Sequence, residues 1–188
     1  YSWNQGLGSG DTKVVSPLVT TTYTVTGTDG NGCIGTDSVT VTINALPTVT
    51  ASNDTSICIG SSLSISANGA SNYSWDNGLG AGMSQTISPI VTTKYIVIGT
   101  DTNGCTNTDS VTVTVNSLPI VTASNDTSIC LGASALITAT GASTYNWDQG
   151  LGAGSSKTVS PATSTSYIVT GTDGNGCINT DTLTITIN

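Results

Sequence analysis

The chain repeats its own sequence every 72 residues, and this period is the strongest constraint on its fold. Trp3, Trp75 and Trp147 keep the spacing, and so do Cys58 and Cys130. A unit of this length is too long for one coil of a solenoid, whose repeats have roughly 20–45 residues, but it suits a small independent domain. We therefore expect a tandem array of modules rather than one domain of 188 residues.

Each repeat contains a pair of alternating runs that predicts a β-hairpin. In residues 21–44, Val39, Val41 and Ile43 occupy one parity of the second run, and Thr40 and Thr42 lie between them. Alternation of Val and Ile with polar residues at period 2 is typical of a half-buried strand. The residues between the two runs favour a tight turn, because Gly and Asn tolerate positive φ. These turn residues are Asp29–Gly32, and the whole pattern recurs at 93–116 and 165–188.

Two Leu-Pro pairs mark the expected module boundaries. Pro47 and Pro119 each follow the last alternating run of a repeat, and Pro ends strand pairing and stiffens a short connection. Residues 1–45 are then the C-terminal part of a truncated module, 46–117 a complete module and 118–188 a second complete module. Because residues 1–45 lack the opening strands of a module, we expect the natural protein to extend beyond this sequence on the N-terminal side, and on the C-terminal side as well.

The complete module at 46–117 predicts about seven short strands with turn signals every 8–12 residues. Asn53 and Asp54 interrupt the first strand, and the Gly-rich stretch 77–82 is interpreted as a flexible crossover. No segment has the 3.6-residue period of a helix. This pattern is typical of a β-sandwich. The predicted strands are Val49–Ser52 continued by Thr55–Cys58, Leu63–Ala67, Tyr73–Trp75, Thr86–Ser88, Tyr95–Gly99 and Val111–Val115.

The composition excludes several classes of function. The chain carries three Lys and Arg residues, no His and a net charge of −8, so we expect neither nucleic acid nor an anionic membrane surface as a partner. No run of about 18 apolar residues predicts a membrane span in this segment. Catalysis lacks its usual residues, because the sequence has no His, no paired Glu and no nucleophile motif. We therefore expect a protein that is not an enzyme and that has no catalytic residues.

Four motifs of the complete module are Cys58-Ile59-Gly60, Tyr73-Ser74-Trp75, Thr93–Val97 and Asp101–Cys105. With these motifs the whole chain resembles the immunoglobulin-like or PKD-like repeats of giant surface proteins in the Bacteroidota. The resemblance implies an all-β fold of tandem immunoglobulin-like β-sandwich modules, located outside the cell or on its surface. Members of that family serve as adhesins, as gliding-motility surface proteins and as extracellular filaments, and they are exported by type IX secretion.

The resemblance also implies roles for single residues. It places the tryptophans on the strand that fills the core and the tyrosines at the start of strand F, so both sets are expected to be structural. An Asp-Ser/Thr-aliphatic pattern resembles the O-glycosylation sites of the Bacteroidota, with an ordinary outward-facing strand residue as the alternative. The tryptophans are Trp3, Trp75 and Trp147, the tyrosines are Tyr23, Tyr95 and Tyr167, and the O-glycosylation candidates are Ser38, Ser110 and Thr182.

Five cysteines in such a chain imply disulfides, and so small a module is expected to need a covalent staple. The resemblance implies a bridge inside one module, from Cys58 to Cys105. Sandwich topology places these two turns at opposite poles, about 33 Å apart, whereas a disulfide requires Cα atoms within about 7 Å. In a head-to-tail array Cys58 reaches Cys177 instead. Both bridges, and unbridged or intermolecular thiols, remain open, and Cys58–Cys177 is our prediction. The other candidates are Cys33 and Cys130.

The aspartates raise the question of a metal site. Asp29–Gly32 and its copies are similar to part of a calcium loop, but no further acidic ligand follows in register. Asp101 and Asp109, near the predicted module ends, are the remaining candidates for binding Ca²⁺. The alternative is that they are turn residues that accept backbone N–H bonds. We expect no other metal and no cofactor, because the chain lacks His and a Cys-x-x-Cys motif.

These observations favour a structural function. Near-identical copies such as 49–58 and 121–130 indicate selection for length and mechanics, so we expect a segment of a long extracellular stalk or filament on a bacterial cell surface. Its expected partners are neighbouring modules of the same chain and identical chains in a fibre. The alternative is an adhesin whose repeats themselves bind a surface glycan or a protein. Loops 76–87 and 148–159 differ only modestly and are not enriched in aromatic residues, which favours the stalk.

Overall fold

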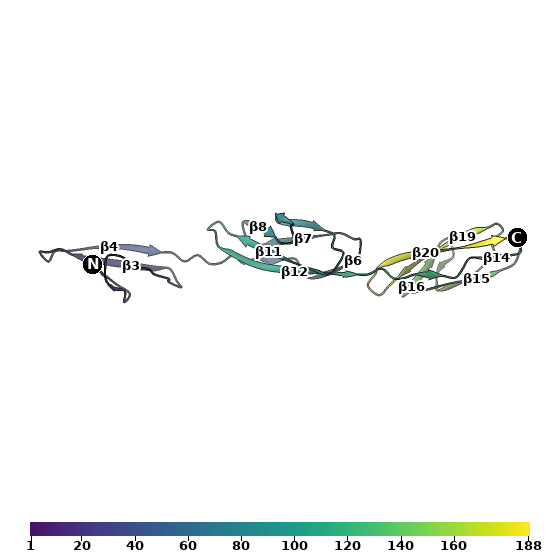
Figure 1. The fold of residues 1–188 in the computed structure, drawn as a ribbon, viewed down its shortest axis with the longest axis horizontal. Helices are drawn as coiled ribbons and strands as arrows, with labels where there is room; N and C mark the ends of the chain where they lie inside the picture. The colour runs from purple at the N-terminus through teal and green to yellow at the C-terminus, as the bar shows by residue number, and fades with distance from the viewer.

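The computed structural model describes residues 1–188, and its regular structure consists of strands β1 to β20. The strands form three groups that follow one another along an elongated rod (Figure 1). We call them the first sheet (β1–β4), the central sandwich (β5–β12) and the C-terminal sandwich (β13–β20). No helix is present that has the length and apolar character needed to cross a membrane. The expected all-β fold is confirmed.

The strand bounds follow the predicted runs closely in the hairpins and less closely elsewhere. In the first sheet they are β1 (Ser2–Trp3), β2 (Gly8–Ser9), β3 (Thr21–Thr28) and β4 (Ile34–Val41). In the central sandwich they are β5 (Thr50–Ala51), β6 (Thr55–Cys58), β7 (Leu63–Asn68), β8 (Asn72–Trp75), β9 (Gly80–Ala81), β10 (Ser84–Ile87), β11 (Thr93–Thr100) and β12 (Thr106–Asn116). In the C-terminal sandwich they are β13 (Thr122–Ala123), β14 (Thr127–Ile129), β15 (Ala135–Thr140), β16 (Thr144–Trp147), β17 (Gly152–Ala153), β18 (Ser156–Val159), β19 (Thr165–Thr172) and β20 (Ile178–Ile187).

Each sandwich consists of two sheets with an immunoglobulin-like strand order. In the central sandwich one sheet has the order β10-β7-β5 and the other β6-β12-β11-β8-β9. The C-terminal sandwich repeats this arrangement with β13-β15-β18 and β14-β20-β19-β16-β17. β11 and β12 form the predicted hairpin, in which Tyr95 pairs with Val111. One sheet thus contains the first, third and sixth strands of the sandwich, and the other sheet contains the hairpin. An immunoglobulin-like fold distributes its strands between two sheets in this way.

The first strand of each sandwich changes sheets where the sequence predicts an interruption. β5 pairs antiparallel with β7, whereas β6 pairs parallel with β12 and brings Cys58 opposite Asn116. In the crossing segment, the Asp54 carboxylate accepts the backbone N–H of Thr112 at 2.7 Å. The side chain thus replaces a backbone partner while the chain passes from one sheet to the other.

The inward positions of the two sheets form a separate core in each sandwich. Side chains such as Ile65, Val97 and Val113 are fully buried in the central sandwich, and burial of an aliphatic side chain contributes roughly 1.5–3 kcal/mol. The central core comprises Val49, Ile65, Ala67, Tyr73, Trp75, Ile87, Tyr95, Val97, Val111 and Val113. The second core comprises Val121, Ala123, Ile137, Ala139, Trp147, Val159, Tyr167, Val169, Leu183 and Ile185.

The first sheet has the hairpin but no opposing sheet. Its order is β2-β1-β3-β4, which corresponds to part of the larger sheet of each sandwich. Val39 is consequently 51% exposed, whereas the residues at the same position of the repeat, Val111 and Leu183, are 0% and 1% exposed. Tyr23 stays buried in the uncovered sheet, but the aliphatic residue at this position is buried only where strands equivalent to β5, β7 and β10 cover it.

The Gly-rich stretch at 77–82 is more ordered than expected. It contains the short strand β9, in which Gly80 pairs with Trp75 and Ala81 with Ser74. The Trp75 indole N–H also donates to the Gly82 carbonyl at 3.0 Å. The buried tryptophan needs a partner for its N–H, so it fixes the returning chain against β8 and removes the flexibility expected from glycine.

Candidate functional site: the joint between the sandwiches

The joint is the region where the end of β12 meets the beginning of β13. β6 and β12 run parallel, so the Cys58 turn and the end of β12 lie at the same pole of the central sandwich. The turn that connects β19 to β20 lies at the facing pole of the C-terminal sandwich, as Figure 1 shows. Chain geometry therefore brings together two turns that are far apart in the sequence.

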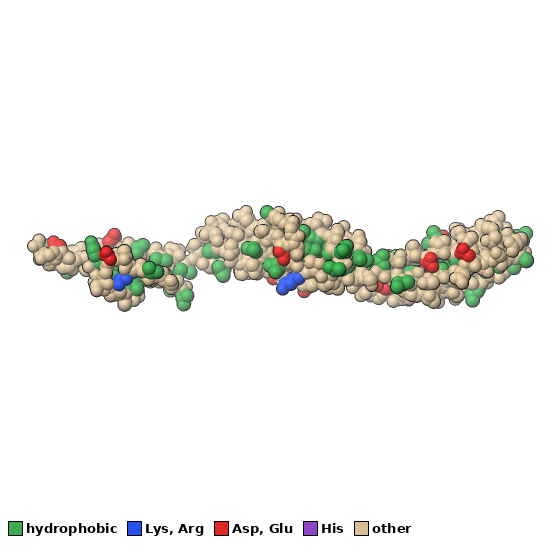
Figure 2. Space-filling view, viewed as in Figure 1, with side chains coloured by type: hydrophobic (Ala, Val, Ile, Leu, Met, Phe, Trp, Pro, Cys, Tyr) green, Lys and Arg blue, Asp and Glu red, His purple; other side chains and the backbone are tan.

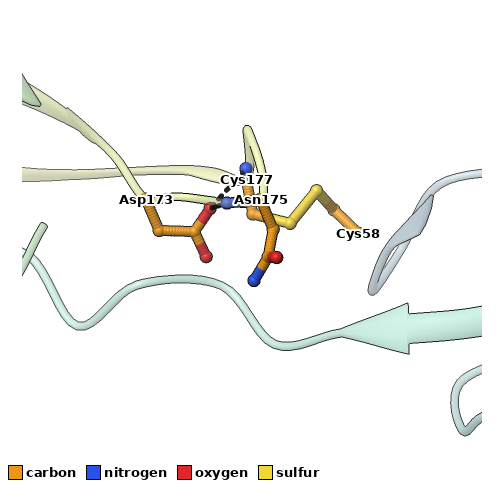
Figure 3. Close-up of a disulfide and its surroundings, with 4 residues drawn as sticks. All are labelled: Cys58, Asp173, Asn175 and Cys177. Atoms are coloured by element: carbon orange, nitrogen blue, oxygen red, sulfur yellow. Dashed lines mark hydrogen bonds between the residues drawn. A yellow bond between two sulfur atoms is a disulfide. The ribbon is translucent and has the colours of Figure 1, made fainter. Parts of the chain in front are cut away.

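A disulfide between Cys58 and Cys177 crosses this joint (Figure 3). The two Cα atoms are 5.5 Å apart, and the cysteines are 119 positions apart in the sequence. That Cα separation is the commonest one for disulfides. Cys177 is fully buried, and Cys58 is partly buried. The bridge is thus an inter-sandwich bond, and the alternative bridge from Cys58 to Cys105 is not formed.

Hydrogen bonds in each turn hold the two cysteines in place. The Asp173 carboxylate accepts the backbone N–H groups of Asn175 and Cys177, both at 2.8 Å (Figure 3). On the other side, the N–H of Ser61 donates to the Cys58 carbonyl at 3.0 Å, and Gly60 between them has φ = 86°. That φ is accessible to glycine at little cost, which explains the Cys-x-Gly sequence.

A second bond fixes the linker of the joint to the C-terminal sandwich. The Asn179 side-chain amide donates to the carbonyl of Pro119 at 3.0 Å, and Pro119 itself is buried. Asn107 makes the same bond to Pro47 at 3.0 Å. The asparagine at this position of β12 and β20 had no role in the sequence analysis. The sequence does mark this position, because an asparagine occurs two residues after both Cys105 and Cys177.

The other three cysteines are unbridged. Cys33 and Cys105 occupy the same turn as Cys177, and their N–H groups donate to Asp29 and Asp101 at 2.8 Å. Cys130 occupies the same turn as Cys58, and its carbonyl accepts the N–H of Ala133 at 3.0 Å. Cys33 and Cys130 are exposed, and Cys105 is half-buried.

The aromatic residues chosen from the sequence lie in or against the cores. Trp75, Trp147, Tyr95 and Tyr167 are at most 5% exposed, Tyr23 is buried, and Trp3 is half-buried because its sheet is uncovered.

Sequence reasoning missed the role of a second tyrosine in each sandwich. The Tyr73 hydroxyl accepts the Ala70 N–H at 2.8 Å and donates to the Ala70 carbonyl at 2.9 Å. It thereby closes the turn between β7 and β8, and Tyr145 does the same at Ala142.

Aspartate side chains accept hydrogen bonds from the backbone throughout the chain. Ten of the eleven acidic side chains accept a backbone N–H. Asp109 on β12 also reaches the other sheet, where it accepts the Ala51 N–H at 2.8 Å. This bond is the main cause that lowers the pKa of Asp109 below its ordinary value, and the bond from the Ser110 N–H is the second cause. Asp181 accepts from Ala123 and Thr182, which lowers its pKa for the same reason.

The remaining site candidates are the aspartates considered for Ca²⁺ and the residues considered for O-glycosylation. The structure contains no group of three or more His, Cys, Asp or Glu residues that could hold a metal ion. Among the O-glycosylation candidates, Ser38 and Thr182 are exposed and Ser110 is half-buried. The Ser110 N–H donates to its neighbour Asp109 at 2.8 Å.

No protein-family model matches the chain, and no curated protein is similar to it. Among solved structures it is similar to the Ig1 and Ig2 domains of DIP-gamma, with 12% identity, a TM-score of 0.35, and coverage of 77% of this chain and 96% of that chain. It is also similar to a Ca²⁺-stabilized adhesin that helps an Antarctic bacterium bind ice, with 15% identity, a TM-score of 0.43, and coverage of 90% and 57%. Immunoglobulin domains 1–5 of Sidekick-1 give 11% identity, a TM-score of 0.37, and coverage of 99% and 51%.

The fold itself assigns the chain to a structural class. Two sheets per sandwich, a hairpin on the larger sheet and a first strand that changes sheets are the features of an immunoglobulin-like domain. The chain is built from tandem immunoglobulin-like β-sandwich modules.

Proposed function

We propose that this chain is a stiff structural segment of a long extracellular stalk or filament on a bacterial cell surface. The observation that carries the proposal is the Cys58–Cys177 disulfide, which ties one sandwich to the next across their joint. A disulfide of this kind persists in an oxidising environment outside the cytosol, which supports the extracellular location. The proposed role is mechanical and not catalytic.

Three connections restrict the joint. They are the peptide linker, the Cys58–Cys177 disulfide and the hydrogen bond from Asn179 to the carbonyl of Pro119. A single peptide linker leaves two small domains able to move relative to each other, which is the usual behaviour of tandem domains. Two covalent connections at separate points of the facing poles must be satisfied together, so they restrict bending and rotation.

Small-angle X-ray scattering of the purified chain tests the stiffness. We expect the two sandwiches of the unmodified chain to scatter as one straight unit, with bending left at the linker between the first sheet and the central sandwich, which no disulfide crosses. The Cys58→Ser/Cys177→Ser variant should give a broader distribution of interatomic distances with a shorter average. Cys105→Ser is the matched control, because Cys105 occupies the same turn as Cys177 but forms no bridge. Identical curves for the double variant and the unmodified chain would contradict the proposed role.

The motif resemblance supports a finer assignment. We infer a surface protein of the Bacteroidota, exported by type IX secretion and belonging to a gliding adhesin or an extracellular filament. Immunogold labelling of intact cells tests this, since the label should disappear when type IX export is blocked. O-glycans would be expected on the exposed Ser38 and Thr182 before the half-buried Ser110, and mass spectrometry of peptides from native material measures them.

A second candidate function is adhesion by the modules themselves, and a recurring cavity favours it. In the central sandwich a cavity of about 360 Å³ lies beside Tyr73, Ser71 and Asn72. An equivalent cavity of about 480 Å³ lies beside Tyr145 and Ser143. Hydroxyl and amide groups beside a hollow suit hydrogen bonding to a sugar, whereas the ring of Tyr73 is buried in the core. Binding of the chain on a glycan array, abolished in the Ser71→Trp/Ser143→Trp variant, would support adhesion; absence of any bound glycan would contradict adhesion to a glycan through these cavities.

A further inference from the structure

The larger sheet of each sandwich has an edge strand that is only partly paired on its outer side. β12 pairs with β11 along residues 106–113, but β6 pairs only with residues 113–116 at the end of β12. β20 has the same arrangement, because β14 pairs only with residues 185–187. Residues 106–112 and 178–184 therefore form an edge that no other strand of the chain covers.

An uncovered edge is a template for a strand of another molecule, because its outward N–H and carbonyl groups are unpaired. Backbone groups alternate sides along a strand, and those of Thr108, Ser110 and Thr112 point away from β11. Residues 106–112 contain one charged residue and neither Pro nor Gly, a composition that favours pairing between chains. The partner that this edge fits is the same edge of a second copy of the chain.

Side-chain oxygens already accept these outward N–H groups in both sandwiches. In the central sandwich the bonds run from the Thr108 N–H to Asn107 at 2.9 Å, from the Ser110 N–H to Asp109 at 2.8 Å and from the Thr112 N–H to Asp54 at 2.7 Å. In the C-terminal sandwich they run from the Thr180 N–H to Asn179 at 3.0 Å, from the Thr182 N–H to Asp181 at 2.8 Å and from the Thr184 N–H to Asp126 at 2.7 Å. Bonds of this kind compete directly with a strand ladder.

Two of the three accepting side chains on each edge are also held at their other end. The Asn107 amide donates to the Pro47 carbonyl at 3.0 Å, and the second carboxylate oxygen of Asp109 accepts the Ala51 N–H at 2.8 Å. Their counterparts in the C-terminal sandwich make the same bonds. These side chains cannot turn away from the edge without breaking a second hydrogen bond.

We propose that these asparagines and aspartates close the edges of β12 and β20 to strand addition, so that copies of the chain lying side by side do not join edge to edge. An incoming strand offers carbonyls to N–H groups that already have acceptors. If that strand is the edge of a second copy, it also brings its own carboxylates against those of the first, and like charges directly opposite each other destabilise strand pairing. The inference goes beyond the proposed stalk function, because it concerns contacts between molecules and not the stiffness of one.

Amide hydrogen exchange at low and at high chain concentration tests the proposal, because strand addition would slow exchange along the edge. All chains carry serine at the three unbridged cysteines, Cys33, Cys105 and Cys130. In the chain with both edges intact, we expect the exchange of residues 106–112 not to change with concentration. In the Asp54→Ala/Asn107→Ala variant, exchange of residues 106–112 should become slower at high concentration. Residues 178–184 of the same variant keep their side-chain acceptors and should not change.

Two further variants separate an open edge from a general loss of stability, which can also make chains associate. Asp76→Ala removes a carboxylate that accepts the Ile96 N–H at 2.9 Å inside the sheet, so exchange at the edge should stay independent of concentration. Adding Thr108→Lys to the Asp54→Ala/Asn107→Ala variant places a cation on the opened edge, which opposes strand pairing. It should abolish the concentration dependence although the two lost bonds are not restored.

The single variant Asn107→Ala gives the same local readout with a smaller disturbance and no change in charge. Exchange of residues 106–112 that does not depend on concentration in either edge variant would overturn the inference. Slower exchange at high concentration in the chain with intact edges would overturn it too, as would the same effect in Asp76→Ala or its persistence with Thr108→Lys. The scattering experiment depends on the Cys58–Cys177 bridge, so the stalk function and the closed edge can fail independently.

Discussion

At the scale of the residue, Gly171 shows how closely the two sheets of a sandwich approach. A Cβ atom at this position would lie 2.5 Å from Val121 Cγ2 and 2.8 Å from Ala142 Cβ. Overpacking of this kind costs about 1–3 kcal/mol. We therefore expect Gly171→Ala to lower the free energy of unfolding of the C-terminal sandwich by this amount, measured by denaturant titration.

The repeat provides a matched control for this substitution. Gly27 holds the same position in the first sheet, where a Cβ atom would meet the Tyr1 ring at 3.2 Å. Tyr1 is 72% exposed and can move. Gly27→Ala should therefore change the stability by less than about 0.5 kcal/mol. Equal losses at the two glycines would show that the sheet-to-sheet distance is not the cause.

The aspartates that connect the two sheets should make stability depend on acidity. The pKa values of Asp109 and Asp181 are lowered by backbone hydrogen bonds to the ionised form. A lowered pKa in the folded state contributes stability that is fully present above the unfolded value, about 3.9, and that is lost as the pH falls through the folded value. We expect denaturant unfolding at pH 7 and pH 3 to show this loss in the unmodified chain.

Asp181→Asn separates this contribution from general acid unfolding. The variant cannot ionise at this position, so its stability should fall less between pH 7 and pH 3 than that of the unmodified chain. Asp11→Asn is the control, because Asp11 is the one acidic residue without a backbone N–H bond. An equal pH dependence in Asp181→Asn and the unmodified chain would refute the assigned role.

At the scale of the element, local chemistry determined what could be predicted. The β11–β12 hairpin was predictable because its alternation and its turn residues lie within 93–116. The interruption at Asn53 and Asp54 was predictable too, but its purpose was not, because Asp54 bonds Thr112 from the far end of the module. Strand β9 was missed for the same reason. The Trp75 indole N–H donates to the Gly82 carbonyl and holds this segment in place. This tertiary hydrogen bond outweighs the tendency of glycine-rich segments to be flexible.

The candidate site was predictable to a similar degree. Sandwich topology, which places the two turns at opposite poles, and head-to-tail stacking were sufficient to propose Cys58–Cys177 against the Cys58–Cys105 bridge that the motif resemblance implies, because both are properties of the fold as a whole. The bond from Asn179 to Pro119 was not foreseen, since it depends on where one side-chain amide points. The sheet-to-sheet bond of Asp109 was missed in the same way.

The same hairpin in two surroundings should differ in local stability. β4 and β12 have closely similar sequences, but the inner face of β4 is uncovered, with Val39 51% exposed against 0% for Val111. Local opening is easiest where few apolar side chains are buried. Amide hydrogen exchange followed by mass spectrometry should therefore label residues 34–41 well before residues 106–113. Simultaneous labelling of both peptides would mean that the opposing sheet does not stabilise the hairpin.

At the scale of the whole molecule, the disulfide determines which part of the chain bears tension. A pull on the two ends passes from β5 and β6 to Cys58, across the bridge to Cys177, and out through β20. In each sandwich this path follows strands that run lengthwise along the rod (Figure 1), and the space-filling view has the same elongated outline (Figure 2). The 118 residues between the two cysteines lie outside the path.

Single-molecule pulling measures this protection directly. A fully extended chain spans about 3.3–3.6 Å per residue, so residues 59–176 hold a hidden length of about 400 Å. We expect the oxidised chain never to release this length, whereas dithiothreitol or Cys58→Ser should add it to the final extension. Cys105→Ser, which leaves the bridge intact, should extend like the unmodified chain. Release of the full length under oxidising conditions would show that the peptide linker, and not the disulfide, carries the tension across the joint.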